Sequence, residues 1–571
     1  MCGIAGIWGE GDIHRMIGVL THRGPDEEGT FKKGPVQLGV RRLAVIDLVT
    51  GSQPIYNEDN TSVIVFNGEI FNYRDLRIEL IALGHTFRTK TDTEVVLHAY
   101  EEWGEGCLDR FIGQFAFCIY DGTKFFIARD RMGEKPLYYY CNKGRFLFAS
   151  EIKAILTQID TQPCIDDMFW VFDAPVLGRT AFADIHELLP GTFMTYQAGC
   201  LEQKRYWDLV PAPVLELPED KIADLVRDLI EDAVNMRMHA DVPIGLFLSG
   251  GIDSAAMAYF ARPAVVFTCR FDLGPAFDEF LYAEKVAQDV RAEHILVSPT
   301  PRDMQRRLPE ILWHLDQPIS TASSIAEFML SEAAARTGVK VVLGGQGADE
   351  LFGGYIRYLL MDIEYRLSRQ PELANYHSLA RFFWSRHLFE DPATRYYQLI
   401  RRARVACEEP YLSIVRSFFE RHDRIIDAMG FTDIQLLLPS LITMNDRASA
   451  AYGLENRSPF LDHRIVELAF RLPPKLKIKE FRTKYILRRA LKGVVPDVIL
   501  ERSDKKGLVV PYHQWLTGPL RAWAGTIEAA LRQRVAVPGC PESRGEFDRS
   551  LYTRVCLYLW LEKFFPSQCV G

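Results

Sequence analysis

The chain lacks several features that would place it in other classes of protein. Its eleven cysteines are scattered along 571 residues with no CxxC pair, which argues against a zinc site or a disulfide framework. Reduced thiols of this kind predict a cytoplasmic protein. No run of about 18 apolar residues could span a membrane. No apolar N-terminal segment resembles a secretory signal.

The chain has no excess of positive charge. The formal net charge is −8, and basic runs such as residues 401–407 are short enough to be solvated helix faces. There is no internal repeat and no low-complexity tract. We therefore expect small-molecule substrates, with neither nucleic acid nor membrane as partner. The length exceeds what one hydrophobic core supports, so two or more domains are expected.

The pattern of elements changes along the chain. Residues 1–208 contain short apolar or alternating runs separated by turn residues, as in a layered sheet domain. The stretch PAPVLELPED, residues 211–220, indicates a linker, which we place at 209–220. In residues 221–571 strands alternate with helices, which predicts a parallel sheet. Beyond about residue 365 the chain looks almost wholly helical.

The first ten residues, MCGIAGIWGE, contain a candidate nucleophile. Removal of Met1 would leave Cys2 with both a thiol, of pKa near ~8.5, and an α-amine, of pKa near ~8. The amine could then take the proton of the thiol and activate it. The alternative is that Cys2 is a small buried residue, as free cysteines often are. Cys2 alone does not decide between them.

A second candidate site follows the apolar run VPIGLFL. The string SGGIDS, Ser249 to Ser254, leads directly into a helix of small residues. Its glycines would let the backbone approach an anion, which the helix N-terminus attracts. Asp253 beside a phosphate could hold Mg²⁺, and Asp349 of GGQGADE could hold the same ion from the opposite side. The alternative is a tight turn with serine and aspartate as helix caps.

Together these motifs resemble those of a known family. MCGIAG, HRGPD (22–26), RLAVID (42–47), NGEIFN (67–72) and TDTEV (91–95) resemble a class II glutamine amidotransferase domain. SGGIDS resembles the pyrophosphate loop of ATP pyrophosphatases and is not a Walker A loop. In this order, over residues 1 to about 565, they resemble the glutamine-hydrolysing asparagine synthetase family. The resemblance implies two α/β domains: an N-terminal Ntn-hydrolase αββα sandwich, and a C-terminal parallel-sheet adenylating domain with a largely helical tail.

The resemblance also implies roles in glutamine hydrolysis. Cys2 would attack the glutamine amide, and the Asn67 side chain and the Gly68 N–H would hold the oxyanion. Arg42 would bind the α-carboxylate and Asp92 the α-amine, the alternative for both being surface ion pairs. The predicted glutamine-binding residues are Arg42, Val45, Ile46, Asn67, Gly68, Glu69 and Asp92. Ammonia would pass between the domains through an intramolecular tunnel.

In the second domain the resemblance implies an ATP site. Lys484 would lie near the α-phosphate and offset charge that develops during adenylation. The predicted ATP-binding residues are Leu248, Ser249, Gly250, Gly251, Asp253, Ser254, Cys269, Gly344, Gly345 and Lys484, with Asp253 and Asp349 holding Mg²⁺. For Leu248 and Cys269 apolar packing is the alternative. Arg457, in a segment like the family's ExRxPFLD, either faces the acceptor or forms a buried ion pair with Glu455 or Asp462.

Two positions depart from the family's pattern. Gln346 stands where a glutamate is usual and cannot act as a base. Ala322 stands where some members carry an arginine that reads aspartate. Both changes fall in the expected acceptor pocket, where specificity resides. The predicted catalytic residues are Cys2, Asn67, Gly68, Asp253, Asp349, Lys484 and Gln346.

The expected activity is ATP- and Mg²⁺-dependent conversion of aspartate, through β-aspartyl-AMP, to asparagine, with glutamate, AMP and pyrophosphate as the other products. The alternative is the same chemistry on another carboxylic acid, as in a natural-product pathway. Ring-closing relatives, which usually lack the N-terminal cysteine, and a non-catalytic relic fit the sequence less well. The family is often dimeric, so a homodimer is an option that the sequence does not test.

Overall fold

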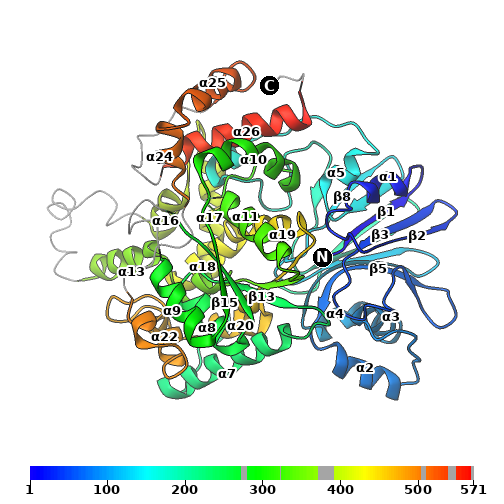
Figure 1. Ribbon diagram of the computed structural model, residues 1–571, viewed down its shortest axis with the longest axis horizontal. Coiled ribbons are helices and arrows are strands. Elements are labelled where there is room, and N and C mark those ends of the chain that lie inside the picture. Colours follow the sequence, from blue (N-terminus) through cyan, green and yellow to red (C-terminus); the bar gives the residue numbers. More distant parts are fainter. Residues whose placement is uncertain (272–278, 322, 371–390, 503–509, 538–547, 567–571) are drawn as a thin grey trace.

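The computed structural model describes residues 1–271, 279–321, 323–370, 391–502, 510–537 and 548–566 (Figure 1). Its N-terminal part holds two six-stranded sheets. One has the order β10-β8-β9-β1-β3-β2 and comprises His186–Glu187, Tyr138–Asn142, Arg145–Ala149, Gly3–Trp8, Val36–Arg42 and Glu27–Lys33. The other has the order β12-β11-β7-β6-β5-β4 and comprises Cys200–Arg205, Thr192–Gln197, Phe125–Arg129, Gly113–Tyr120, Val63–Ile70 and Ile55–Tyr56. Neighbouring strands in both sheets are antiparallel.

Apolar side chains on both faces of these sheets explain the layering. Ile4, Val65 and Ile127 belong to a core between the sheets. On the outer face of the second sheet, Phe66 packs with α2 (Tyr73–Ala82) and α3 (Asp92–Trp103). On the outer face of the first sheet, Ile7 packs with α1 (Ile13–Gly18) and α5 (Ile152–Leu156). The predicted αββα sandwich is confirmed. Shorter elements of this part are η1 (Gly104–Gly106), α4 (Cys107–Arg110) and α6 (Asp167–Phe172).

A five-stranded parallel sheet forms the centre of the remaining chain, in the order β15-β14-β13-β16-β17. The strands are Glu293–Val297, Val265–Cys269, Ile244–Phe247, Val341–Leu343 and Glu455–Arg457. Helix α7 (Glu219–Arg237) precedes the first strand, and the helices that follow are α8 (Ile252–Ala261), α9 (Phe280–Val290), α10 (Pro301–Leu315), α11 (Ser324–Arg336) and α12 (Ala348–Phe352). The predicted parallel-sheet domain is confirmed.

Helices dominate the tail. They are α13 (Ile356–Ser368), α16 (Pro392–Ile400), α17 (Glu409–Arg421), α18 (Ile425–Leu436), α19 (Leu438–Ala450), η3 (Pro459–Leu461), α20 (His463–Ala469), α21 (Pro474–Lys477), α22 (Tyr485–Ala490), α23 (Asp497–Leu500), α24 (Tyr512–Thr517), α25 (Arg521–Leu531) and α26 (Ser550–Phe564). The predicted largely helical tail is confirmed, and it also contributes β17, a strand of 3 residues that joins the parallel sheet beside β16. Its sequence, ENR, has no β-type pattern, so tertiary pairing imposes the strand.

The predicted linker at residues 209–220 overlaps the start of a helix. Helix α7 begins at Glu219, inside the stretch predicted as linker, where Glu219 and Asp220 favour the positive end of the helix. The domain limits 1–208, 209–220 and 221–571 stay a prediction. No single helix among the described residues has the length and apolarity to cross a membrane. Helices α18 and α19, which are bent relative to each other, meet both criteria only when they are taken together. Most residues of these two helices are buried in the fold.

Two candidate active sites

Cys2 lies at the start of β1, in the core between the two antiparallel sheets, and is 8% exposed. Its Sγ lies 3.9 Å from the backbone oxygen of Leu43. Burial raises the pKa of the thiol, and the adjacent α-amine opposes that rise. Burial also lowers the pKa of the Met1 amine to about 5, which makes it neutral at pH 7. A buried thiol of this kind needs a neighbouring base before it can attack a substrate.

Asn67 and Gly68 lie on β5, in the sheet that faces β1. The Asn67 side chain is completely buried, yet neither its Nδ2 nor its Oδ1 has a hydrogen-bond partner among the described residues. An unsatisfied buried amide costs about 1–3 kcal/mol. At Gly68, a Cβ atom would lie 2.1 Å from the backbone oxygen of Gln114, so only glycine fits. A buried amide without a hydrogen-bond partner, next to closely packed backbone, indicates a place where a polar ligand binds.

Asp92 and Glu69 form a buried acidic pair next to these residues. Asp92 begins α3, and its Oδ2 accepts a hydrogen bond of 2.9 Å from the N–H of Ile70. Burial, together with the nearby Asp92 carboxylate, raises the pKa of Glu69 well above its usual range, although Arg457 acts in the opposite direction. Burial also raises the pKa of Asp92. Such a pair favours an incoming ammonium group, which would allow both carboxyls to ionise.

Arg42 is buried rather than at the surface. Its Nη1 lies 3.0 Å from Glu27 Oε1, and its Nη2 donates to the carbonyls of Ile46 and Asp47 at 3.1 and 2.7 Å. The Val45 carbonyl accepts a hydrogen bond from Asp241 N. Because Arg42 and Asp92 are each 3% exposed, the surface ion pairs considered for them are wrong. The partner Glu27 was not predicted, since no motif contains it.

A cavity of about 410 Å³ opens beyond the carboxyl ends of β13, β14 and β16, where open parallel sheets bind ligands. Its lining includes most of the predicted nucleotide and acceptor residues: Leu248, Ser249, Asp253, Ser254, Cys269, Gly344, Gly345, Gln346 and Asp349. Gly250 and Gly251 lie in the same loop but are not part of that lining. Ala322 lies outside the described residues.

The loop from Ser249 to Ser254 has the shape of an anion cradle. The two serine Oγ atoms are 3.1 Å apart, and the Gly251 N–H donates to Ser249 Oγ at 3.3 Å. Gly250 has φ +74°, and a Cβ atom there would lie 2.9 Å from the Glu279 backbone oxygen. Helix α8 begins at Ile252, within this segment, so its positive end faces the cavity side.

Lys484 lies between the two acidic residues predicted to hold the metal. Its Nζ is 2.7 and 2.6 Å from the two carboxylate oxygens of Asp253 and 2.7 Å from Asp349 Oδ1. All three groups are largely shielded from solvent. Two carboxylates that converge on one cation have the charge and the oxygen donors that Mg²⁺ requires. The residues present therefore fit a magnesium ion.

Gln346 and Arg457 differ in their surroundings. Gln346 lines the cavity, and its Oε1 accepts a hydrogen bond of 3.3 Å from Ser458. Arg457 is fully buried and pairs with Glu455 at 2.7 Å and with Glu69 at 3.0 Å. The acceptor-facing interpretation of Arg457 is therefore wrong, and the ion pair with Glu455 is confirmed. Glu69 adds a link from this segment to the acidic pair beside Asp92.

Two further carboxyls in the cavity were missed. Glu350 Oε1 accepts a hydrogen bond of 2.7 Å from Tyr355, and burial together with Asp349 raises its pKa to about 7. Burial raises the pKa of Glu327, on α11, to about 8. Glu350 follows Asp349 in the acidic loop and could have been found there. Glu327 lies in the same segment as Ala322, which was expected to form part of the acceptor pocket, but Glu327 itself was not singled out.

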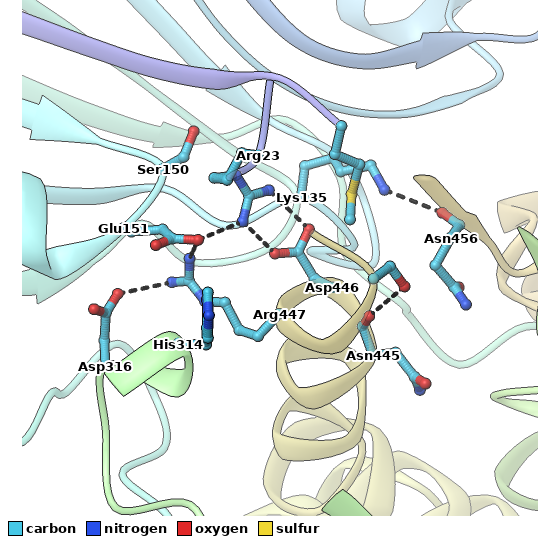
Figure 2. Close-up of polar contacts among 12 residues, drawn as sticks. Arg23, Lys135, Ser150, Glu151, His314, Asp316, Asn445, Asp446, Arg447 and Asn456 are labelled. Carbon is cyan, nitrogen blue, oxygen red and sulfur yellow. Dashed lines mark hydrogen bonds and ion pairs between the residues drawn. The ribbon is translucent and has the colours of Figure 1, made fainter. Parts of the chain in front are cut away.

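A buried network of charges joins the two halves of the chain (Figure 2). Arg23 donates to the Cys2 carbonyl at 3.1 Å and makes two hydrogen bonds with Asp446 of α19, at 2.8 and 3.1 Å. Arg447 pairs with Glu151 at 2.6 Å and with Asp316 at 3.2 Å. Met444 and Asn445, on the same helix, line the cavity. The network thus connects the backbone of Cys2 to a wall of the nucleotide cavity.

We expect Asp446→Asn to destabilise this interface. The substitution removes one charge from a buried pair and leaves Arg23 incompletely compensated, which costs about 3–5 kcal/mol of unfolding free energy. Thermal unfolding of the full chain measures the loss. The matched control is Glu409→Gln, whose carboxylate pairs with the part-exposed Arg416 and contributes at most about 1 kcal/mol. Equal melting temperatures for the two variants would contradict the prediction.

Both halves of the chain are similar to known protein families. The family model for a glutamine amidotransferase domain matches residues 1–207, and the model for asparagine synthase matches residues 225–539. Asparagine synthetase [glutamine-hydrolyzing] 1 of Bacillus subtilis is 33% identical, over 92% of this chain and 90% of its own length. A putative asparagine synthetase [glutamine-hydrolyzing] of Mycobacterium tuberculosis is 32% identical, over 98% and 94%. Amidase chyE of Penicillium rubens is 29% identical, over 89% and 86%.

Proposed function

Because this chain belongs to the glutamine-hydrolysing asparagine synthetase family and is an ATP-using amide synthetase of that type, we propose that its acceptor is aspartate and its product asparagine. The observation that carries the proposal is the presence of both half-sites in one chain. The glutaminase half-site contains Cys2 and the Asn67 amide, which has no hydrogen-bond partner among the described residues. The synthetase half-site contains Lys484 between two aspartates. We place the reaction in the cytoplasm.

In the first half-reaction, Cys2 attacks the side-chain amide of glutamine, with the α-amine at the chain start as the base once Met1 is removed. The C–N bond breaks and ammonia leaves, and water then hydrolyses the thioester to give glutamate and free Cys2. The Asn67 Nδ2 and the Gly68 N–H stabilise the oxyanion, each such donor being worth about 3–4 kcal/mol in a preorganised site. Asp92 and Glu69 bind the α-ammonium. Arg42 binds the α-carboxylate, sharing its guanidinium with Glu27 or exchanging that partner for the substrate.

In the second half-reaction, Ser249, Ser254 and the start of α8 bind the phosphates of ATP. Asp253 and Asp349 would hold Mg²⁺, which, when bound, neutralises phosphate charge. Lys484 keeps its ammonium next to the phosphates and stabilises the negative charge that grows as the acceptor carboxylate is adenylated. Leu248 and Cys269 provide apolar contacts to the nucleotide. Ammonia then displaces AMP from the acyl-adenylate and gives the amide.

Ammonia reaches the acyl-adenylate through the interface between the two halves. A second cavity of about 10 Å³, enough for a molecule the size of water, lies between Lys135 on one side and Gln346 on the other. Gln346 and Asn445 line both this cavity and the large one. In this proposal Gln346 marks the entry of ammonia into the acceptor pocket. It acts by hydrogen bonding, since an amide is not a base.

A second acceptor class has an observation of its own in its favour. Gln346 replaces the usual glutamate in the acceptor region, and a relative over most of the chain is an amidase rather than an asparagine synthetase by name. Polar groups of the pocket decide which carboxylic acid is bound. The alternative is therefore glutamine-dependent amidation of a different carboxylic acid in a biosynthetic pathway.

We expect pyrophosphate release to depend on aspartate when the purified protein is given ATP, Mg²⁺ and glutamine, with asparagine formed in equal amount by mass spectrometry. Omission of aspartate is the control. Glutamate formation without aspartate-dependent pyrophosphate would reject aspartate as acceptor. A panel of carboxylic acids under the same conditions would then identify the alternative one.

A further inference from the structure

A cluster of imidazoles and carboxylates lies in the glutaminase half, apart from both candidate active sites. It contains Glu58, His85, His98 and Glu101, and we name it the His–Glu cluster. Its members come from three segments: the turn after β4, the loop between α2 and α3, and the second half of α3, which lies on the outer face of its sheet (Figure 1). One nitrogen or oxygen atom from each residue lies within 4.8 Å of the others. We infer that the His–Glu cluster binds a divalent transition-metal ion of the Zn²⁺ type.

The ligand atoms converge in the manner that such an ion requires. Glu58 lies between the two imidazoles, its carboxylate oxygens 3.1 Å from His85 Nδ1 and 3.4 Å from His98 Nδ1. Glu101 Oε2 lies 2.8 Å from the same nitrogen of His98. In a tetrahedral site with bonds of about 2.0–2.1 Å, neighbouring ligand atoms are about 3.4 Å apart. The three measured nitrogen–oxygen distances, 2.8, 3.1 and 3.4 Å, are equal to that value or shorter, so small outward shifts of the side chains would complete the site.

The second nitrogen of each imidazole faces another carboxylate. His98 Nε2 lies 3.8 Å from Glu94 Oε1, and His85 Nε2 lies 3.6 Å from Glu102 Oε2. When Nδ1 binds a metal, the remaining proton of the imidazole is on Nε2, and a carboxylate in that position fixes the tautomer. In the present structure His98 Nε2 is buried and has no hydrogen-bond partner among the described residues. The outer groups thus complement metal-bound histidines.

Packing holds the ligands in place. His98 is fully buried, and its ring lies 4.8 Å from those of His85 and Phe87. Glu58 Oε1 also accepts the N–H of Thr86 at 3.1 Å, and Asn57 Nδ2 donates to Glu101 Oε1 at 2.5 Å. Glu58 and Glu101 remain part-exposed, which leaves a path for an ion from solvent.

The charge balance favours a cation. Four carboxylates lie beside the two imidazoles of the cluster, those of Glu58, Glu94, Glu101 and Glu102. Imidazole nitrogens with carboxylates suit zinc and its neighbours, whereas Mg²⁺ prefers an all-oxygen set.

Calorimetric titration of Zn²⁺ into the chelator-treated full-length protein tests this inference. We expect about one equivalent to bind, and His85→Gln and His98→Gln each to weaken it by more than about 100-fold, beyond the loss of an outer-shell group. The control is His14→Gln, an exposed histidine whose Nδ1 also lies near a glutamate, at 3.5 Å. Bound Zn²⁺ should raise the melting temperature of the unsubstituted protein and not of the two ligand variants.

If His98→Gln fails to fold, Glu101→Gln, at the part-exposed side of the site, gives the same comparison. In addition, the visible absorption of Co²⁺ bound to the unsubstituted protein directly reports tetrahedral nitrogen and oxygen ligands. Absence of Zn²⁺ binding, or binding that His85→Gln and Glu101→Gln leave unchanged, would overturn the inference and identify any bound ion as adventitious.

Discussion

Cys2→Ala should abolish glutamine-dependent amide synthesis, with a loss of at least about 10³-fold, because loss of a covalent nucleophile leaves only binding and oxyanion stabilisation. Synthesis from added ammonium should persist, since the predicted ATP-binding residues all lie in the other half of the chain. Cys2 is buried, and alanine fills most of the same space, so the fold should survive.

The measurement is pyrophosphate release with glutamine or with ammonium chloride as nitrogen source. Cys118→Ala is the matched control, because Cys118 is also a buried thiol of the same core and no role is proposed for it. Mass spectrometry of the intact protein should show that Met1 has been removed. Glutamine-dependent turnover by the Cys2 variant at the unsubstituted rate would reject Cys2 as the nucleophile.

Lys484→Met should impair adenylation and spare glutamine hydrolysis, whereas Cys2→Ala impairs glutamine hydrolysis and spares adenylation. It removes the ammonium between Asp253 and Asp349, leaves two carboxylates facing each other, and takes away a charge that supports adenylation. Loss of one such group costs about 10²–10³-fold in rate. Pyrophosphate release should therefore fall with either nitrogen source, whereas hydrolysis of glutamine at Cys2 should continue.

Lys479→Met is the control for this variant. Lys479 comes from the same segment but pairs with Glu219, with both side chains part-exposed. Assays of glutamate and pyrophosphate in parallel separate the two half-reactions. Retention of pyrophosphate release by Lys484→Met, at a saturating ATP concentration, would exclude Lys484 from the adenylation site.

The two half-sites could be predicted because their residues occur in short continuous motifs. Ser249 to Ser254 follow a buried strand, and backbone geometry largely fixes where such a loop lies. A layered sheet domain could be predicted because turn residues separate the strands, whereas the αββα order of its layers came from the resemblance to the family. For these features the local sequence and the fold agree.

Other features depend on residues that only the folded chain brings together. Arg457 contacts Glu69, and the carboxylate that pairs with Arg42 belongs to β2. Glu58, His85 and His98 come from three segments whose spacing matches no metal motif. Strand β17 consists of polar residues that form a strand only because β16 offers a free edge. Pairing between distant segments overrides local propensity at each of these places.

The position of β17 has a consequence for how the protein folds. In the parallel sheet Val341 pairs with Glu455, and Gly344 of the acidic loop donates to the Arg457 carbonyl at 2.9 Å. That contact closes a long segment of chain, and such closure slows folding. During synthesis the sandwich emerges first and can fold on the ribosome, as N-terminal domains generally do. The acidic loop gains its last neighbouring strand only after translation has passed Arg457, beyond the first helices of the tail, so the capacity to use glutamine should arise before the capacity to use ATP.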